Sequence, residues 1–370
     1  KIMSKEQIIV GITHGDINGV GYEVIIKSLM DNRIMEDCTT LVYGSPKVAA
    51  YHRKALNIDN FSFNNIREVS EANNKRANII NCLDDNVRVE LGKSTVMAGE
   101  SAVIPLEQAV KDLADNKIDV IVTAPINKYN IQSETFSFPG HTEYLKSRFN
   151  VDDVLMLMVA DDLRIGVVTG HLPLRQVPDS LDKEGIVRKI RIMEKSLSVD
   201  FRIRKPRIAV LSLNPHSGDT GLLGDEEIEI IIPAIEQASE EGILAFGPYP
   251  SDGFFGSGSF MNFDGILAMY HDQGLTPFKA LALGEGVNFT AGLPVVRTSP
   301  SHGTAYEIAG KGIASENSFR KAIYLACDIF RNREMQNEIT ANPLKHHDLD
   351  TRAEIPDELP PEETNTNEEV

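Results

Sequence analysis

The sequence is poor in cysteine, has no long apolar run and carries no excess of positive charge. Its three cysteines, Cys38, Cys82 and Cys327, lie far apart and form no CxxC pair. They exclude a cysteine zinc site and are typical of reduced thiols in a cytoplasmic protein. No run of about 18 apolar residues occurs, which argues against a helix that spans a membrane. The first residues lack the apolar core of a signal peptide, so we expect a cytoplasmic location and no membrane partner.

The charge balance is acidic. The formal net charge is −17, from 37 basic and 54 acidic residues. Such a chain is a poor partner for nucleic acid, whose phosphates need clustered Lys and Arg. Nine acidic residues and one arginine lie between Asp348 and Val370. Apolar periodicity fades from about residue 342, so we expect residues 342–370 to form a disordered acidic tail.

Short apolar runs alternate with turn residues and helical patterns along the rest of the chain. This alternation predicts an α/β fold with a largely parallel sheet. With 370 residues, 42% of them hydrophobic, the chain is long enough for two domains or for one large body with a cleft. The predicted strands are Ile8–Ile12, Val120–Val122, Leu163–Val168, Ile208–Leu213 and Gly265–Tyr270, and the predicted helices are Ser101–Leu113, Lys183–Leu197 and Glu226–Glu240.

Polar clusters follow the carboxyl ends of these apolar runs, which is where open α/β sheets bind their ligands. Three of the nine histidines, His171, His216 and His271, each come shortly after a predicted strand. Three imidazoles with an open coordination position make a catalytic site for a divalent transition metal. Taken singly, each is better explained as a hydrogen-bonded loop or core histidine, and only the equivalent placement of all three favours a shared metal site.

Two stretches are candidates for binding an anion. His141 and Thr142 follow a Pro-Gly turn at the start of a predicted helix, where backbone N–H groups can face a phosphate. An ordinary helix cap would give the same pattern. Lys279, Asn288 and Arg297 lie in a stretch dominated by Gly, Thr and apolar residues. Cations in such a stretch indicate a lined pocket, and a structural ion pair is an equal alternative.

The first predicted strand is followed by glycines that do not form a known nucleotide fingerprint. Gly15, Gly19 and Gly21 are present, but Val24 stands where the GxGxxG pattern requires glycine. No Walker A motif occurs in the sequence either. The glycines are therefore equally consistent with a tight turn from strand to helix.

A second glycine-containing segment runs from Ser301 to Gly312. Its pattern predicts a loop that enters a short helix, and the His302 side chain is able to stack on a nucleotide base or hydrogen-bond to it. A capped surface helix explains the same pattern equally well.

A set of short motifs occurs in a fixed order between about Ile8 and Ala314. They are Gly15–Glu23, Thr123–Lys128, Phe138–Glu143, Gly170–Leu174, Leu213–Gly218, Gly224–Glu227, Gly247–Asp252, Met269–Gly274, Gly286–Thr290, Gly292–Pro294, Arg297–Ser299 and His302–Ala305. The ordered set resembles the 4-hydroxythreonine-4-phosphate dehydrogenase family of pyridoxal phosphate biosynthesis. The chain departs from the usual family pattern at Ile17, Asn18 and Tyr22.

The resemblance implies a fold similar to those of isocitrate and isopropylmalate dehydrogenases, with two α/β/α lobes and a cleft between them. Residues 1–130 and about 300–341 would form lobe one, and residues 131–299 would form lobe two. The resemblance also implies a homodimer with the active site near the interface.

The resemblance further implies a role for each candidate residue. His171, His216 and His271 would bind one divalent metal, with zinc or cobalt favoured and magnesium or manganese as alternatives. Asp252 would lie nearby as a proton acceptor or organiser of the metal site. The substrate would be bound by His141, Thr142, Lys279, Asn288 and Arg297, and the NAD or NADP by His302, Gly303, Thr304 and Ala305.

The implied reaction is the NAD-dependent oxidation of 4-phosphooxy-L-threonine, followed by decarboxylation to 3-amino-1-hydroxyacetone 1-phosphate. One alternative is a dehydrogenase of a four-carbon sugar-acid phosphate, such as threonate or erythronate 4-phosphate. A second is an acyl-phosphate transferase of similar fold, which needs neither NAD nor the three histidines. A third is a metabolite-binding protein without catalytic activity.

Overall fold

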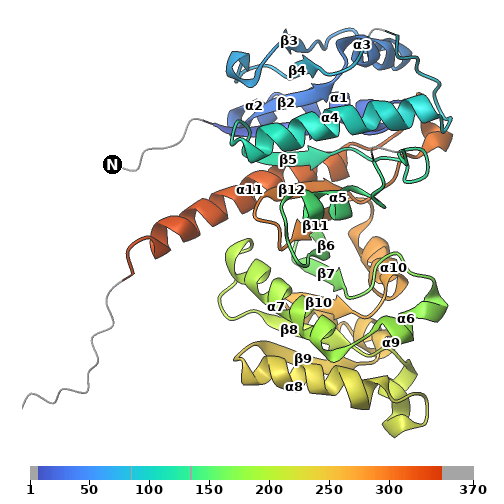
Figure 1. Cartoon of the computed structure of the whole chain (residues 1–370), viewed down its shortest axis with the longest axis vertical. Coiled ribbons are helices and arrows are strands. Elements are labelled where there is room, and N and C mark those ends of the chain that lie inside the picture. The colour runs from blue at the N-terminus through green and yellow to red at the C-terminus, as the bar shows by residue number, and fades with distance from the viewer. Residues whose placement is uncertain (1–6, 85, 134–135, 344–370) are drawn as a thin grey trace, which may run out of the picture.

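The computed structural model describes residues 7–84, 86–133 and 136–343 of the chain. Its strands form one continuous sheet in the order β3-β4-β2-β1-β5-β12-β11-β6-β7-β10-β8-β9 (Figure 1). This sheet passes through the whole body and carries Asn288 and Arg297 among the candidate site residues. The strands are β1 (Ile8–Thr13), β2 (Cys38–Gly44), β3 (Asn64–Ile66), β4 (Asn78–Asn81), β5 (Val120–Thr123), β6 (Leu155–Ala160), β7 (Leu163–Val167), β8 (Arg207–Leu211), β9 (Leu244–Tyr249), β10 (Gly265–Ala268), β11 (Val287–Ala291) and β12 (Val296–Pro300).

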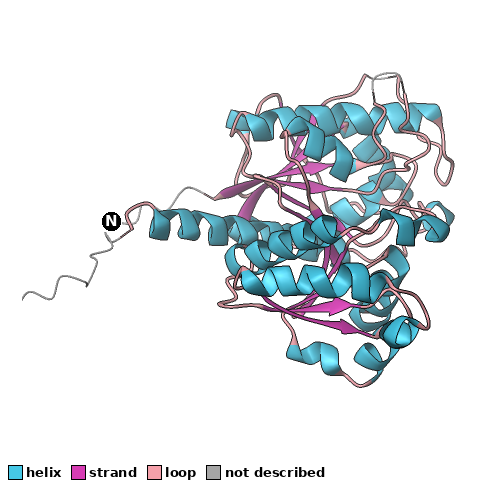
Figure 2. Ribbon diagram, turned by 60° about the horizontal axis from the view of Figure 1, so that its bottom comes forward, coloured by secondary structure: helices cyan, strands magenta, loops and turns pink. Residues whose placement is uncertain are grey.

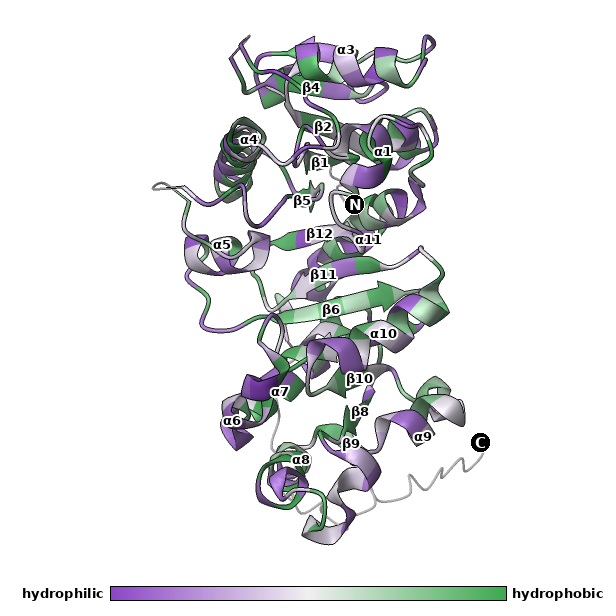
Figure 3. Cartoon of the chain, turned by 90° about the vertical axis from the view of Figure 1, so that its right-hand side faces the viewer, coloured by the Kyte–Doolittle hydropathy of each residue, from purple (hydrophilic) through white to green (hydrophobic). Residues whose placement is uncertain are grey.

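Helices cover both faces of the sheet (Figure 2). One face packs against α1, α3, α7, α8 and α11, and the other packs against α4 and α5 in one half and α9 and α10 in the other. Figure 3 shows the apolar strands running between these helices. The helices are α1 (Gly21–Leu29), α2 (Ile34–Asp37), α3 (Pro46–Ala55), α4 (Val96–Ala114), α5 (His141–Arg148), α6 (Val177–Ser180), α7 (Lys183–Val199), α8 (Ile232–Glu240), α9 (Ser251–Gly256), α10 (His271–Ala282) and α11 (Asn317–Thr340).

Local sequence determines where the longer helices begin. Before α4, the Thr95 side chain accepts a hydrogen bond from the N–H of Ala98, and before α7 the Asp182 side chain accepts one from the N–H of Gly185. Each cap satisfies one of the N–H groups that the start of a helix leaves unpaired. Strand β2 is buried along its whole length, as expected for a strand that is covered on both faces.

The sheet contains two parallel blocks that run in opposite directions. Strands β3, β4, β2, β1, β5 and β12 form the first block, and β7, β10, β8 and β9 form the second. Between them lie β11 and β6, and each pairs antiparallel with both of its neighbours. Three successive reversals leave the second block antiparallel to the first. The strands of the two blocks therefore point their carboxyl ends in opposite directions.

The predicted α/β fold with a largely parallel sheet is confirmed. The predicted strands and helices are present, and the helix predicted at Glu226–Glu240 begins as a short π-helix, Glu227–Ile231, before α8. The division into two lobes stays a prediction. One sheet joins both halves of the body, so the sheet itself marks no boundary between lobes. From residue 344 onward the predicted acidic tail lies outside the described residues. No helix within the described ranges is long and apolar enough to cross a membrane.

Candidate active site

A pocket with a volume of about 290 Å³ lies over one face of the central strands. Side chains two residues apart on a strand point to the same face. The strand residues that line the pocket follow this period, with Met156 and Met158 on β6 and Arg297 and Ser299 on β12. On β11, Asn288 pairs in register with both Met158 and Ser299. The pocket therefore lies where the two blocks of the sheet meet, and not at one sheet edge.

Most of the predicted site residues line this pocket. They come from two strands, from the start of α5, from both ends of α10 and from loops, so only the folded chain brings them together. The lining includes His141, Thr142, His171, His271, Lys279, Asn288, Arg297, His302 and Gly303.

Arg297 is a buried cation, with only 3% of the residue exposed. Its Nε and Nη2 atoms donate to Thr123 Oγ1 at 3.2 and 2.8 Å, and its Nη1 donates to Thr290 Oγ1 at 3.0 Å. Within the described residues no carboxylate forms an ion pair with it. Burial lowers the pKa of Arg297 to about 10, and nearby Glu143 opposes this shift. A buried charge is costly unless it is paired, so a guanidinium held by hydroxyl groups is suited to receive an anion.

The first turn of α5 adds hydrogen-bond donors near Arg297. The helix starts at His141 after Gly140, and no side chain caps it. Thr142 therefore does not cap the helix, and the first N–H groups remain available to an anion. Burial, together with the charges of Arg297 and Lys128, lowers the pKa of His141 well below its usual 6.5. The His141 ring is therefore neutral at pH 7. We call Arg297, His141 and this first turn the anion side of the pocket.

His171 and His271, which we call the histidine side, meet in the same pocket. Their ring centroids lie 5.7 Å apart. Lys128 Nζ lies 2.7 Å from His171 Nε2, and His271 Nδ1 lies 2.7 Å from Asp272 Oδ1. Burial, then Lys128 and His271, lowers the pKa of His171 and so favours the neutral ring, which is the form that binds metal. Two imidazoles, one backed by a carboxylate, fit part of a transition-metal site.

The other two predicted residues, His216 and Asp252, do not line this pocket. His216 is exposed and opens a run of five residues, His216–Thr220, with left-handed backbone angles. Each non-glycine residue in that conformation costs roughly 1–2 kcal/mol, and such strain is concentrated at functional sites. Asp252 is exposed at the start of α9. No group of three His, Cys, Asp or Glu side chains within the described residues could hold a metal, so the three-histidine site stays a prediction.

Buried polar atoms without partners mark the pocket as a ligand site. Buried polar groups in proteins are nearly always hydrogen-bonded. In the described part of the chain, His141 Nε2, Asn288 Oδ1 and His302 Nε2 are buried and have no partner, and all three residues line the pocket. The unsatisfied atoms include an amide oxygen and two ring nitrogens. A polar ligand would satisfy them.

The predicted cofactor segment runs from the pocket toward the start of α1. His302 and Gly303 line the pocket. The Thr304 carbonyl accepts a hydrogen bond of 3.0 Å from the N–H of Val20, and Ala305 has a left-handed backbone with φ of 45°. Burial lowers the pKa of His302, so its ring is neutral at pH 7. These contacts place the segment between the pocket and the start of α1.

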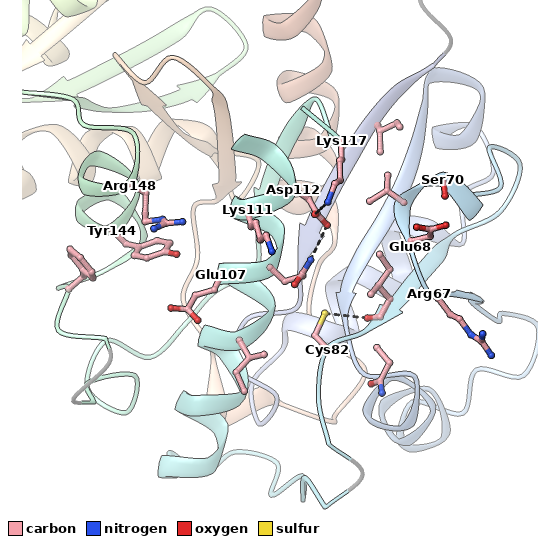
Figure 4. A pocket seen from close by; sticks show the side chains of 17 residues that line it. Arg67, Glu68, Ser70, Cys82, Glu107, Lys111, Asp112, Lys117, Tyr144 and Arg148 are labelled. Atoms are coloured by element: carbon pink, nitrogen blue, oxygen red, sulfur yellow. Dashed lines mark hydrogen bonds and ion pairs between the residues drawn. The ribbon is translucent and has the colours of Figure 1, made fainter. Parts of the chain in front are cut away.

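A larger groove of about 1280 Å³ lies elsewhere, between α4, β4 and α5 (Figure 4). Its buried carboxylate, Asp112, accepts hydrogen bonds from Tyr43 Oη at 2.9 Å, Gln108 Nε2 at 3.3 Å and Lys117 Nζ at 3.0 Å. None of the buried unpaired atoms found in the described ranges belongs to this groove. Its buried carboxylate is already satisfied, and no buried unpaired atom in its described lining points to a ligand.

The family of the chain follows from comparison with known proteins. The family model described as Pyridoxal phosphate biosynthetic protein PdxA matches residues 36–326. The chain belongs to the PdxA family. The resemblance inferred from the ordered motifs is therefore confirmed.

Individual PdxA relatives and structures agree with this assignment. The chain is 57% identical over 345 residues to a 4-hydroxythreonine-4-phosphate dehydrogenase of Bacteroides thetaiotaomicron, covering 93% of this chain and 94% of that protein. It is 38% identical over 339 residues to a D-threonate 4-phosphate dehydrogenase of Cupriavidus necator, covering 90% and 100%. The crystal structure of 4-hydroxythreonine-4-phosphate dehydrogenase from Klebsiella pneumoniae matches with a TM-score of 0.77 and 33% identity, covering 88% and 100%.

Four further residues of this PdxA chain belong to the site, although the sequence pattern assigns them no role. Thr123 and Thr290 hold the buried guanidinium. Lys128 and Glu143 line the pocket, and Glu143 is the one carboxylate among its described lining residues. Lys128 carries a signal in the sequence, because it follows β5 much as the histidines follow their strands. The two threonines carry none, since threonine is ordinary in a strand.

Proposed function

We propose that this chain is a metal-dependent dehydrogenase that oxidises 4-phosphooxy-L-threonine with NAD or NADP. The observation that carries the proposal is the buried Arg297 guanidinium, which has no counter-ion in the described structure and lines a pocket with His141 and Asn288. A buried cation beside unpaired polar atoms fits a small anionic substrate. The relative that is 57% identical is named 4-hydroxythreonine-4-phosphate dehydrogenase, which favours that substrate.

The anion side would bind the substrate phosphate. Arg297 and the N–H groups at the start of α5 supply donors for its oxygens, and charge-assisted hydrogen bonds of this kind are the strong ones. Neutral His141 would add one more hydrogen bond without adding charge. Lys279 lines the same pocket and is exposed, so it would neutralise a second negative charge of the substrate.

The proposed reaction removes a hydride and a proton from the substrate. The carbon that carries the hydroxyl transfers its hydride to the nicotinamide, while the hydroxyl proton passes to a base, and a ketone forms. The product is a 2-amino-3-oxo acid, whose carboxylate lies β to the ketone. Loss of CO2 moves the bond electrons toward that ketone and gives an enolate, and a proton taken up at the carbon that carried the carboxylate then gives 3-amino-1-hydroxyacetone 1-phosphate. A divalent metal, when bound, would supply a Lewis acid for the oxygen at this carbon.

His171 and His271 would hold that metal together with His216, and zinc or cobalt suits imidazole ligands better than magnesium or manganese does. Because His216 does not line the pocket of its own chain, we assign its ligand role to the pocket of a second copy. Asp252, the proposed proton acceptor, also lies outside its own pocket.

A homodimer with the site near its interface is therefore part of the proposal. The left-handed turn of His216 is followed by exposed apolar side chains, with Leu222 exposed by 77% and Ile228 by 50%. Exposed apolar side chains that gather in one region often mark a protein interface. A partner that covers them would also receive the outward-facing His216.

The amine of the substrate has a candidate partner in Glu143. This carboxylate lines the pocket and lies close enough to Lys128 and Arg297 to shift their pKa values. A substrate ammonium would be attracted to it, whereas the hydroxyl of a sugar acid carries no charge. The second candidate function, a D-threonate 4-phosphate dehydrogenase, rests on the relative from Cupriavidus necator.

A substrate panel tests the proposal. NAD and NADP reduction would be followed by absorbance with 4-phosphooxy-L-threonine, D-threonate 4-phosphate and erythronate 4-phosphate, with metal content measured on the same preparation. We expect the fastest reduction with the amino acid, together with release of CO2. Faster reduction with a sugar acid would select the second candidate. No reduction with any of them, together with acyl transfer from an acyl phosphate, would overturn both. The cytoplasmic location inferred from the three free cysteines remains part of the proposal.

A further inference from the structure

Two buried carboxylates near the start of α1 take no part in the function proposed above. Asp16 lies in the glycine-containing turn after β1, and Glu23 lies in the first turn of α1. Their exposed fractions are 1% and 0%. Carboxylates are rarely buried unless they are paired and hydrogen-bonded. The partners of these two therefore indicate what the turn is for.

Asp16 joins the turn to the segment that follows β12. Its Oδ2 accepts a hydrogen bond of 2.7 Å from Tyr306 Oη and one of 2.8 Å from Asn130 Nδ2. Its Oδ1 accepts from the N–H of Asn18 at 2.8 Å. Burial, then the bond to Asp16, raises the pKa of Tyr306 to about 12. Tyr306 therefore remains a hydrogen-bond donor at every pH that the enzyme would meet.

Glu23 holds the other end of the same segment. Its Oε1 accepts a hydrogen bond of 2.9 Å from the N–H of Ala314 and one of 2.8 Å from Lys27 Nζ. The same Lys27 ammonium donates to the carbonyls of Gly312 at 2.9 Å and Ala314 at 2.7 Å. One ion pair thus fixes three polar groups of a segment that has little regular structure.

The middle of the contact requires a glycine. A Cβ atom at Gly19 would lie 2.7 Å from the Thr304 carbonyl oxygen, too close for any other residue to fit without movement. The adjacent Val20 N–H donates to that same carbonyl at 3.0 Å. The turn after β1 and the segment after β12 are therefore built to lie against each other. The glycines serve this approach as well as the turn itself.

We infer that Asp16 and Glu23 are positioning residues that hold residues 302–314 in shape to bind the dinucleotide. The inference rests on the proposed function, because it takes residues 302–305 as the cofactor loop. A loop that must be ordered on binding loses affinity through conformational entropy. Fixing it in advance at Tyr306 and Ala314 removes that loss. The two anchors act through the loop and do not touch the reacting atoms.

The test is the affinity for NAD of the full chain carrying Tyr306→Phe or Asp16→Asn. We expect the Kd and KM for NAD to rise about tenfold in Tyr306→Phe, which loses one hydrogen bond to a carboxylate, and at least as much in Asp16→Asn, whose carboxylate accepts three. The kcat at saturating NAD and the Kd of the phosphorylated substrate should change by less than about twofold. The double variant should bind NAD little worse than Asp16→Asn alone, because the bond that Tyr306→Phe removes is one of the three that Asp16 accepts.

Tyr51→Phe is the matched control, because Tyr51 lies on α3 and is 46% exposed. Hydrogen exchange of the amides in 302–314 should speed up in Tyr306→Phe and not in Tyr51→Phe. An unchanged Kd for NAD in Tyr306→Phe would overturn the inference and leave the proposed function standing. A general loss of kcat and substrate affinity would also overturn it, because it would show a purely structural role. A wild-type chain that binds neither NAD nor NADP would overturn both.

Discussion

The two sides of the pocket differ in how far one chain completes them. On the anion side, Arg297 is held by Thr123 and Thr290, and the helix start and the ring of His141 are already in place. On the histidine side, His171 and His271 meet, but the third predicted ligand, His216, lies on an exposed turn elsewhere. One chain therefore brings together the groups of the proposed anion site by itself. The proposed metal site lacks its third ligand within the described residues of one chain.

The largest effect is expected on the histidine side, and it is tested by mixing two inactive variants. Single alanine substitutions at His171, His216 or His271 should each abolish turnover. If His216 serves the partner's pocket, mixing refolded His216→Ala and His271→Ala chains rebuilds one intact site in each mixed dimer. About one quarter of the wild-type rate should return, since half of the dimers are mixed and each has one working site.

The matched control mixes His171→Ala with His271→Ala. Both residues line the same pocket of one chain, so no mixed dimer has an intact site, and the rate should stay at background. Recovery in this control, or none in the first mixture, would contradict a site shared between two copies. Metal content measured on each mixture gives the same comparison without relying on turnover.

Arg297→Ala should have the next largest effect, confined to the anion side. Charge-assisted hydrogen bonds to an anion are worth about 1.5–3 kcal/mol, so kcat/KM for the phosphorylated substrate should fall roughly tenfold to a hundredfold. Metal content and the Kd for NAD should stay near those of the wild type. Arg148→Ala is the control, because Arg148 is exposed at the far end of α5, away from the first turn that lines the pocket. Wild-type kcat/KM in Arg297→Ala would make this arginine a structural residue only.

Glu143→Gln should have a smaller and selective effect. Its carboxylate is exposed enough for water to screen it, so we expect the kcat/KM for 4-phosphooxy-L-threonine to fall about fivefold. The kcat/KM for D-threonate 4-phosphate should hold or rise, because that substrate has no ammonium group to lose. Steady-state rates with both substrates measure the ratio. An equal fall for the two would remove Glu143 as the partner of the amine.

The smallest expected effect is a difference in pH response between the two sides. The pKa of His141 is held well below 6.5, and the pKa of Arg297 is about 10. We therefore expect both groups to keep their charge as the pH falls from 7.5 to 5.5. Sulfate, which does not titrate in this range, should bind with a constant Kd. Zinc should bind more weakly as pH falls below about 6, because protonated imidazole is no ligand. Because the pKa of His171 is lowered, its ring stays neutral and able to bind metal down to a more acidic pH. Calorimetry would measure the Kd of sulfate and of zinc at each pH. A sulfate Kd that rises as the pH falls would contradict a fixed charge on the anion side.

Much of this site could be predicted from the sequence because its residues follow apolar runs. Arg297 and Asn288 were marked by their apolar surroundings, and His171 and His271 by their position after β7 and β10. The left-handed turn at His216 gave no signal, since the backbone of such residues depends on the packing around them.

The sequence also gives no indication of the direction in which each strand runs. Strand β6 is a plain apolar run, and only its pairing with β11, far along the chain, makes the two blocks of the sheet run in opposite directions. Apolar patterns predict that a strand exists, but its neighbours are decided by contacts between distant residues. The α/β class was therefore predictable, and the position of the pocket over the face of the sheet was not.

The unbroken sheet limits how this molecule can open and close around a ligand. Strands β12, β11, β6 and β7 are joined edge to edge by hydrogen bonds across the middle of the body. A hinge that swung one half away from the other would have to break those ladders. Closure over a substrate must therefore come from a change in sheet twist or from movement of the loops above it. The floor of the pocket is made of these hydrogen-bonded strands, so we expect the loops at its rim to move more than the floor does.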